Sequence, residues 1–155
     1  MTAKEYWLED FVPGVTHVSP SRTISEEEAL AFARRYDPQV FHVDPVAAKA
    51  TDFGQLVLGG FQTAALSWAL VQESRMFDQC PIAGIGIDEL RWHVSVKPGD
   101  TLHCRFTLLD SRVSASKPDR GVARFRYEVV NQDGTTVMTL VILQLLRRRP
   151  AALVA

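Results

Sequence analysis

The sequence predicts an α+β protein in which an antiparallel sheet of about five strands wraps around one long central helix. Residues 59–73, GGFQTAALSWALVQE, place apolar side chains around nearly the whole circumference of a helix, which is typical of a buried helix. From Ile82 onward the apolar positions instead recur with a period of two, which is typical of strands with one wet face. This combination predicts the hot-dog fold, as a single domain over residues 1–155.

The composition is that of one globular domain. Of the 155 residues, 46% are hydrophobic and 23% are charged, and a chain of this length buries roughly two thirds of its unfolded surface. The formal net charge of −1 does not favour nucleic acid, whose binding proteins usually carry a basic face. The N-terminal residues lack a secretory signal, and no apolar run approaches the roughly 18 residues of a membrane span. We therefore expect a cytoplasmic protein with no membrane contact, in which Cys80 and Cys104 are reduced thiols.

An amphipathic helix is predicted before the central one. Ser25, with Glu28 three residues later, forms a capping box at its start, and apolar side chains then follow one helical face. Pro38 disfavours helical geometry at the residue before it, so the helix should end at about Tyr36. Asp37 therefore begins a loop.

A second short helix is predicted to begin at Asp44, because an N-cap acid followed by Pro45 is a typical helix start. His42 should lie just before that start. The connection between the two helices thus holds Asp37 and His42 five residues apart.

The strands of the sheet are predicted from alternating apolar positions. They cover residues 14–24 before the first helix, and 86–96, 101–113, 122–131 and 135–146 after the central one. KPGD at 97–100 has the proline and glycine of a type II turn, and NQDG at 131–134 is a tight hairpin signal. Neighbouring strands should therefore be antiparallel, and the tail 147–155, RRRPAALVA, is expected to fray.

Three segments resemble a known family: YDPQVFHVDPVAA (36–48), GQLVLGGFQTAAL (54–66) and LRWHVSVKPGDTL (90–102). They look like the MaoC-like acyl dehydratases, also described as (R)-specific enoyl-CoA hydratases, and the likeness covers most of the chain. The family pattern is an aspartate, four residues, a histidine, a short helix, and a glycine that opens the central helix. In this sequence the corresponding residues are Asp37, His42 and Gly60.

One position departs from the common form of the motif. That form has glycine before the aspartate and an Asn-Pro pair before the histidine, where this chain has Tyr36 and Gln39-Val40. Tyr-Asp-Pro-Gln is itself a frequent variant, so the departure is Val40, where proline is usual. Its effect is to weaken the preset geometry of the loop.

The chemistry of hydration assigns roles to these residues. Adding water across an enoyl thioester needs a base for the water that attacks C3, an acid for C2, and a donor for the charge on the thioester oxygen. We assign Asp37 and His42 to the water and the N–H of Gly60 to the carbonyl, with Gly59 allowing close approach. The resemblance implies syn addition, an (R)-3-hydroxyacyl thioester and a reversible reaction. Coenzyme A is then part of the substrate, and no separate cofactor or metal is expected.

Several other side chains are assigned more simply. Some family members hold the catalytic aspartate with a serine on the central helix; here Thr63 and Ser67 are the available hydroxyls, and the choice between them stays open. The remaining candidates are interpreted as follows: His17, His93 and His103 as sheet residues without chemistry, Asp44 as an N-cap and no metal ligand, Arg147, Arg148 and Arg149 as solvent-exposed or gripping the phosphates of coenzyme A, and Phe53, Phe61 and Trp68 as core or as the wall of an acyl tunnel.

Two other functions compete with hydration. A hot-dog thioesterase would often place its acid on the central helix, which here offers none before Glu73. A non-catalytic acyl-thioester-binding subunit, or one partner of a heteromeric dehydratase, would tend to lose the pair of Asp37 and His42. A homodimer is expected, because edge-to-edge pairing removes the open edge of the sheet. In the family the acyl groove runs along that interface. The acyl chain itself is not predicted.

Overall fold

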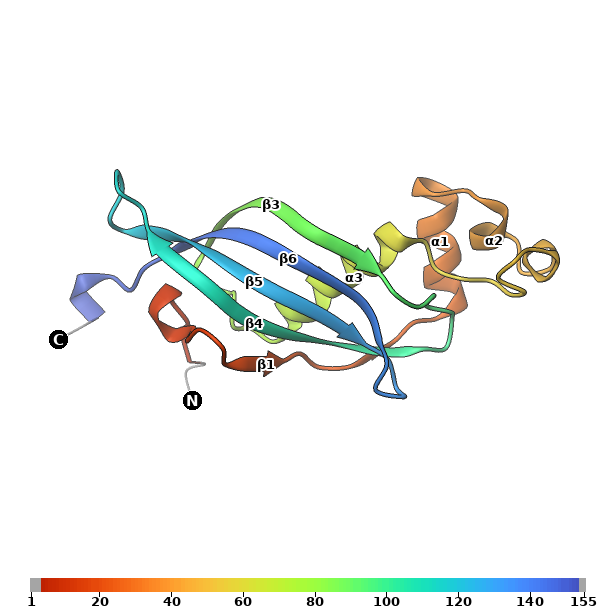
Figure 1. Cartoon of the computed structure of the whole chain (residues 1–155), viewed down its shortest axis with the longest axis horizontal. Helices are drawn as coiled ribbons and strands as arrows, with labels where there is room; N and C mark the ends of the chain where they lie inside the picture. The colour runs from red at the N-terminus through yellow and green to blue at the C-terminus, as the bar shows by residue number, and fades with distance from the viewer. Residues whose placement is uncertain (1–3, 154–155) are drawn as a thin grey trace.

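The computed structural model describes residues 4–153. Its elements are η1 (Leu8–Asp10), β1 (Thr16–Val18), β2 (Arg22–Thr23), α1 (Glu26–Tyr36), α2 (Val40–Val43), η2 (Ala47–Ala50), α3 (Gly60–Glu73), β3 (Pro81–Trp92), β4 (Thr101–Val113), β5 (Arg120–Val130), β6 (Thr136–Arg147) and η3 (Ala151–Leu153). Figure 1 shows a long twisted sheet with α3 lying along it and with α1 and α2 gathered at one end. This arrangement is the predicted hot-dog fold.

Within residues 4–153, six strands form one sheet. Five of them follow the order β1-β4-β5-β6-β3, and the sixth, the short β2, pairs with β4. All pairs are antiparallel, as expected from the turns. The sixth strand arises because the segment 14–24 forms two short strands instead of one. Pro20 interrupts it, since proline has no N–H to give to the ladder.

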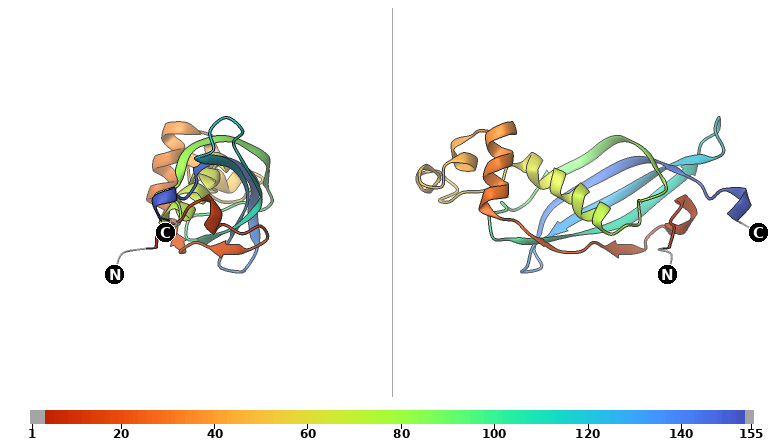
Figure 2. Two further views of the ribbon diagram at one scale, coloured as in Figure 1. Left: turned by 90° about the vertical axis from the view of Figure 1, so that its left-hand side faces the viewer. Right: turned by 180° about the vertical axis from the view of Figure 1, so that it is seen from behind.

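The core lies between the inner face of the sheet and α3. Phe106, Phe125 and Tyr127 alternate with exposed neighbours on β4 and β5 and have no exposed surface. Leu66 and Leu70 face them from the helix and belong to the same hydrophobic cluster. Figure 2 shows the sheet curling around one side of α3.

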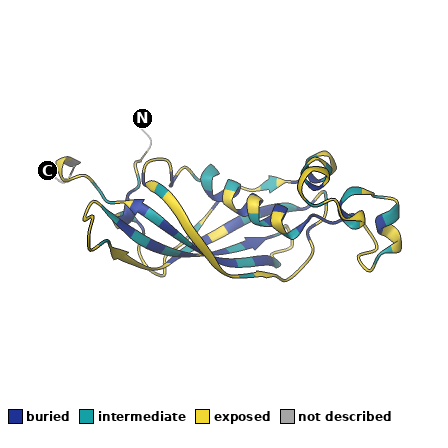
Figure 3. Ribbon diagram, turned by 90° about the horizontal axis from the view of Figure 1, so that it is seen from above, coloured by how far each residue is buried: buried dark blue, intermediate teal, exposed yellow. Residues whose placement is uncertain are grey.

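The prediction that α3 is buried all round is wrong for a single chain. Its side toward the sheet is buried, but Phe61 is 68% exposed, Trp68 is 37% exposed and Ala65 is also exposed. These positions recur at helical spacing, so they form one stripe on the side that the sheet does not reach. Figure 3 shows this exposed stripe.

The edge strand β3 is also exposed along most of its length. It pairs with β6 on one side only, and Ile85 and Ile87 are 54% and 52% exposed. A long edge strand with apolar side chains is a surface on which another strand can pair.

The predicted start of α1 and both predicted turns are confirmed. Oγ of Ser25 accepts the N–H of Glu28 at 3.1 Å, and α1 ends at Tyr36. Gly99 and Gly134 have φ of +94° and +78°, which glycine adopts without a steric cost. The first turn is closed by the N–H of Asp100, which donates to Lys97, and the second by the N–H of Gly134, which donates to Asn131, each at 3.1 Å.

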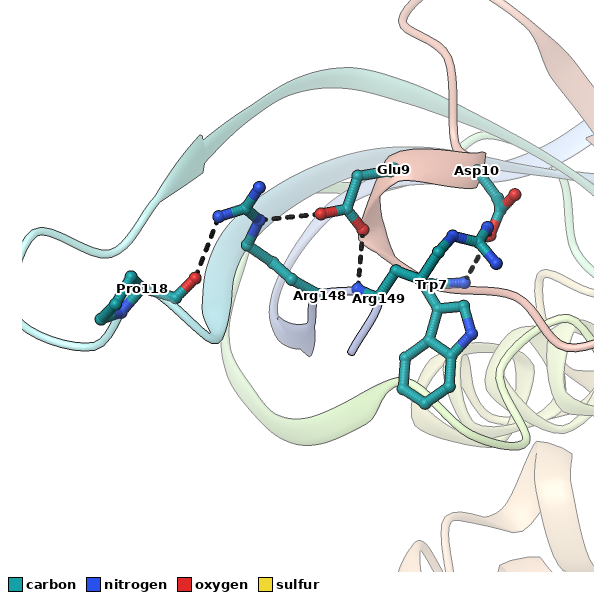
Figure 4. A network of polar contacts seen from close by, with 6 residues as sticks. All are labelled: Trp7, Glu9, Asp10, Pro118, Arg148 and Arg149. Carbon is teal, nitrogen blue, oxygen red and sulfur yellow. Dashed lines mark hydrogen bonds and ion pairs between the residues drawn. The ribbon is translucent and has the colours of Figure 1, made fainter. Parts of the chain in front are cut away.

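The tail after β6 is held to the N-terminal turn, so the expectation that it frays is wrong for Arg148 and Arg149. Nε of Arg148 donates to Glu9 at 2.8 Å, and a guanidinium N–H of Arg149 donates to Asp10 at 2.6 Å. Figure 4 shows these contacts, which we call the terminal clasp (Glu9, Asp10, Arg148 and Arg149). The same expectation for residues 154 and 155 lies outside the described residues.

Both cysteines are free, as predicted, and both are buried. Burial raises the pKa of Cys80 to about 11 and that of Cys104 to about 12, so both are held as neutral thiols. Within residues 4–153, no helix combines the length and the apolar character needed to cross a membrane.

Candidate active site

Asp37 and His42 lie at the end of the sheet that carries α1 and α2. Asp37 caps the C-terminus of α1, and its N–H donates to Ala33 at 2.9 Å. His42 precedes the helical turn after Asp44, as predicted, but it also lies inside a one-turn helix, α2, that was not predicted. Asp44 has the extended backbone that the residue before proline favours, so α2 ends at Val43.

Asp44 caps a turn as predicted, but the turn leads into a 3₁₀ helix. Its Oδ1 accepts the N–H groups of Val46 and Ala47, each at 2.9 Å. These two hydrogen bonds lower the pKa of Asp44. Its carboxylate is therefore occupied by the backbone.

His42 is held in one orientation by the segment that precedes α3. Its Nδ1 lies 2.7 Å from the carbonyl oxygen of Val57, and the ring is 7% exposed. A carbonyl oxygen only accepts, so Nδ1 carries the proton and Nε2 of the neutral ring is left with a lone pair. The N–H of Val57 in turn donates to Phe41 at 3.0 Å, which fixes α2 against this segment.

The free nitrogen of His42 faces Asp37. Nε2 lies 3.5 Å from Oδ2 of Asp37, which is a loose contact that lets both groups bind one small molecule. Oδ1 of Asp37 instead accepts the side-chain amide of Gln39 at 2.8 Å. Gln39 therefore orients the carboxylate and leaves Oδ2 toward His42.

The two glycines at the start of α3 are required by close contacts. A Cβ atom on Gly59 would lie 2.7 Å from Oδ2 of Asp37, and one on Gly60 would lie 2.5 Å from the indole of Trp92. Both distances are too short for real atoms. Gly60 is the first residue of α3, so its N–H has no partner within the helix.

Neither hydroxyl of α3 touches Asp37. Thr63 donates to the carbonyl of Gly59 at 3.4 Å, and Ser67 donates to the carbonyl of Ala64 at 2.6 Å. Both are the local bonds that helical serine and threonine often make. The side-chain hydrogen bond to Asp37 comes instead from Gln39.

These groups open into a cavity of about 410 Å³. It is lined by Asp37, Gln39, Phe41, His42, Phe53, Val57, Leu58, Gly60, Phe61, Thr63, Trp92, His93, Val94, Ser95 and Val96. Phe53 and Phe61 line the cavity, which agrees with the interpretation that they form the wall of an acyl tunnel. Trp68 does not line it. The cavity is an apolar slot in which the carboxylate of Asp37, the imidazole of His42 and the helix N–H of Gly60 lie together, with His93 as a second imidazole in the wall.

Sequence reasoning missed three residues of this wall. The sequence predicts Gln39 only as a frequent variant of the motif, Trp92 only as part of a strand and His93 only as a sheet residue without chemistry. His93 does bond within the sheet, with Nε2 2.8 Å from the hydroxyl of Thr139, but it also lines the cavity. The role of Gln39 could have been predicted from the sequence, because a side-chain amide two residues after Asp37 is close enough to donate a hydrogen bond to its carboxylate.

The other residues to which no chemistry was assigned, His17 and His103, lie outside the cavity lining. The ring of His17 packs against Phe11 and Phe106, and burial lowers its pKa; burial also lowers the pKa of His103. Arg148 and Arg149 belong to the terminal clasp and Arg147 is exposed, and none of the three lines the cavity. In the described part of the chain, no three His, Cys, Asp or Glu side chains gather as metal ligands would.

The chain belongs to the MaoC-like domain family, whose model matches residues 12–130. Among solved structures, a MaoC-like dehydratase from Rhodospirillum rubrum is 33% identical, with a TM-score of 0.84 over 93% of this chain and 98% of that one. Among curated proteins, the uncharacterized protein YdeM of Bacillus subtilis is 30% identical over 68% of this chain and 74% of its own.

A more distant structure shares the fold. The unliganded (R)-hydratase PhaJ1 from Pseudomonas aeruginosa is 20% identical, with a TM-score of 0.72, over 94% of this chain and 88% of that one. The match to the MaoC-like family model confirms the predicted resemblance.

Proposed function

We propose that this protein catalyses the reversible hydration of trans-2-enoyl-CoA thioesters to (R)-3-hydroxyacyl-CoA. The observation that carries the proposal is the facing pair of Asp37 and His42 beside the free N–H of Gly60, in one apolar cavity. Membership of the MaoC-like family supports it, and so does the shared fold of a named (R)-hydratase.

In the hydration direction, one water binds between Oδ2 of Asp37 and Nε2 of His42. The pair removes a proton as the water oxygen attacks C3, and returns a proton to C2, so that the two steps add one water in total. Both transfers use groups on one side of the cavity, which agrees with the syn addition that the resemblance implies. A positioned base or acid contributes about 10²–10⁴-fold to such a step.

The N–H of Gly60 receives the charge that develops on the thioester oxygen. It lies at the positive end of α3, and Gly60 has no side chain that would hold the thioester away. The thioester carbonyl then lies at the C2 end of the conjugated double bond, and the attacking water lies at the C3 end. Coenzyme A remains outside the apolar slot. It is not released in any step, because the thioester is not cleaved.

The rival functions lack such support. Glu73 is the first acid on α3, and it is paired with Arg22 near the far end of the helix, not in the cavity. A purely binding subunit would have no need of an imidazole whose proton is fixed on Nδ1. We therefore favour hydration over thioester hydrolysis and over binding without catalysis.

The proposal includes a homodimer and a cytoplasmic location. The open edge of β3 and the exposed stripe of α3 are apolar surfaces that a second copy would cover. Phe61 lies both on that stripe and in the cavity wall, so dimerisation would also enclose the acyl slot. Two buried, free thiols suit a reducing compartment.

The test is the loss of ultraviolet absorbance from a short trans-2-enoyl-CoA, with Asp37→Asn beside the native protein. We expect the conjugated enone to disappear without release of free thiol, and kcat to fall by about 10²–10⁴-fold in the variant. Free thiol would identify a thioesterase instead. No reaction across several chain lengths would favour the binding role.

A further inference from the structure

Trp92, the last residue of β3, reaches across to the first turn of α3. Its Nε1–H donates to the carbonyl oxygen of Gly60 at 2.9 Å, although 32 residues separate the two in sequence. The indole also meets the ring of Phe61 edge to face, with centroids 5.7 Å apart. A strand end is thereby tied to the helix start that carries the proposed oxyanion donor.

The same indole lies directly against the backbone of Gly60. A Cβ atom there would come within 2.5 Å of Cε2 and 2.8 Å of Nε1 of Trp92. A Cβ atom on the neighbouring Gly59 would meet Asp37 at 2.7 Å. The two glycines are therefore in close contact with both the carboxylate and the indole.

This helix start has no side-chain cap. The carbonyl oxygen of Gly59 accepts from Thr63 and the N–H of Leu58 donates to Val96, but Gly59 is the N-cap and provides no side-chain hydrogen bond. Two successive glycines also leave the backbone between these bonds with the widest conformational choice. An oxyanion donor acts only when its direction is fixed before the reaction. Trp92 is 49% exposed, so burial of apolar surface alone does not account for its placement.

We propose that Trp92 is a positioning residue that fixes the N–H of Gly60 toward the thioester oxygen. The inference rests on the proposed oxyanion role of Gly60. Trp92 acts through the glycine: the ring blocks movement of its Cα, and the hydrogen bond holds its carbonyl. Trp92→Phe removes the hydrogen bond and keeps an aromatic ring, whereas Trp92→Leu removes both restraints.

Two readouts test this proposal. The first is steady-state hydration of a short trans-2-enoyl-CoA, where we expect kcat to fall about tenfold in Trp92→Phe and further in Trp92→Leu, with KM changed less than about twofold. Loss of a whole oxyanion donor costs roughly 10²–10³-fold. The second is the infrared carbonyl frequency of bound butyryl-CoA, an unreactive probe. Binding to the native protein should lower it, and the variants should lose much of that shift.

Trp7→Phe is the matched control. The indole N–H of Trp7 is buried without a hydrogen-bond partner among the described residues, and Trp7 lies beside the terminal clasp, outside the cavity. It should change neither kcat nor the carbonyl shift. Thermal melting of each variant checks that the comparison is made on folded protein.

The outcomes separate this inference from the proposed reaction. If the native protein hydrates the enoyl-CoA but Trp92→Phe and Trp92→Leu keep its kcat and carbonyl shift, the positioning role is wrong and the reaction stands. If the native protein shifts the carbonyl and the variants do not, while no hydration occurs, the positioning role stands and the reaction is wrong. A native protein that leaves the bound carbonyl unshifted overturns the positioning role.

Discussion

The side-chain amide of Gln39 donates to Oδ1 of Asp37 at 2.8 Å. The other carboxylate oxygen, Oδ2, lies 3.5 Å from Nε2 of His42. The proposed catalytic pair therefore depends on a third residue, two positions after the aspartate.

Gln39→Ala should lower kcat by about tenfold while leaving KM nearly unchanged, because a carboxylate without its partner samples unproductive directions. Steady-state hydration of a short enoyl-CoA measures both constants. Gln72→Ala, on the last turn of α3 and outside the cavity lining, is the control and should match the native protein. Equal kcat for Gln39→Ala and the native protein would show that the hydrogen bond has no part in the reaction.

Gly59→Ala should lower activity far more than stability. The new Cβ must displace Oδ2 of Asp37, and a shift of about 1 Å costs on the order of 10²-fold in rate. Gly121→Ala should behave in the opposite way. Its Cβ would meet the backbone of Arg112 and the side chain of Leu8 at 2.6 Å, and overpacking of this kind costs about 1–3 kcal/mol of stability.

Kinetics and chemical denaturation on both glycine variants separate these effects. If Gly59→Ala instead unfolds the protein and keeps full activity per folded molecule, Asp37 is not placed by this contact.

The edge of β3 should hold two copies together. A double substitution, Ile85→Lys and Ile87→Lys, places charge on the open edge and should convert a dimer into a monomer, as charged edge strands resist pairing. Sedimentation of the native and altered proteins measures their masses. Val113→Lys, an exposed residue on β4, is the control. A native protein that sediments as a stable, fully active monomer would contradict the dimer.

Acid should weaken the terminal clasp. Burial alone would raise the pKa of Glu9, but hydrogen bonds from the N–H of Arg149 and the guanidinium of Arg148, with the charge of Arg148, lower it below 4.5. A carboxylate with a lowered folded pKa stabilises the fold above its unfolded pKa and loses that contribution as pH falls through the folded value.

Denaturation of the native protein and of Glu9→Gln tests the clasp. Glu9→Gln should be the less stable of the two near neutral pH, and the difference should shrink as pH falls from about 4.5. A difference that stays constant with pH would mean that the charge of Glu9 contributes nothing.

The sequence predicted the parts of the fold that local signals determine. The cap at Ser25, the stop before Pro38 and the turn at Gly99 each depend on residues within four positions of one another, so their geometry is readable from spacing. The period-two pattern likewise located β4 without error in its bounds. The pairing of Asp37 with His42 was local enough to be anticipated.

The parts that were missed depend on contacts between distant segments or between copies. Trp92 reaches Gly60 only because β3 ends beside the start of α3, and no spacing in the sequence shows that proximity. The apolar pattern of α3 predicts burial of the stripe at Phe61 and Trp68, but apolar character does not show which neighbour covers a side chain, and the stripe is exposed in the single chain. One sheet reaches only one side of a helix.

The sheet order has a consequence for synthesis of the chain on the ribosome. The strand β3 is made before β4 and β5, yet its partner in the sheet is β6, which is made last of the six. Until β6 emerges from the exit tunnel, β3 has no neighbour in the finished sheet, and the wall that carries Trp92 cannot form. Folding of the pocket must therefore wait for translation of β6, and a nascent chain stalled before it would present an apolar, unpaired strand to chaperones.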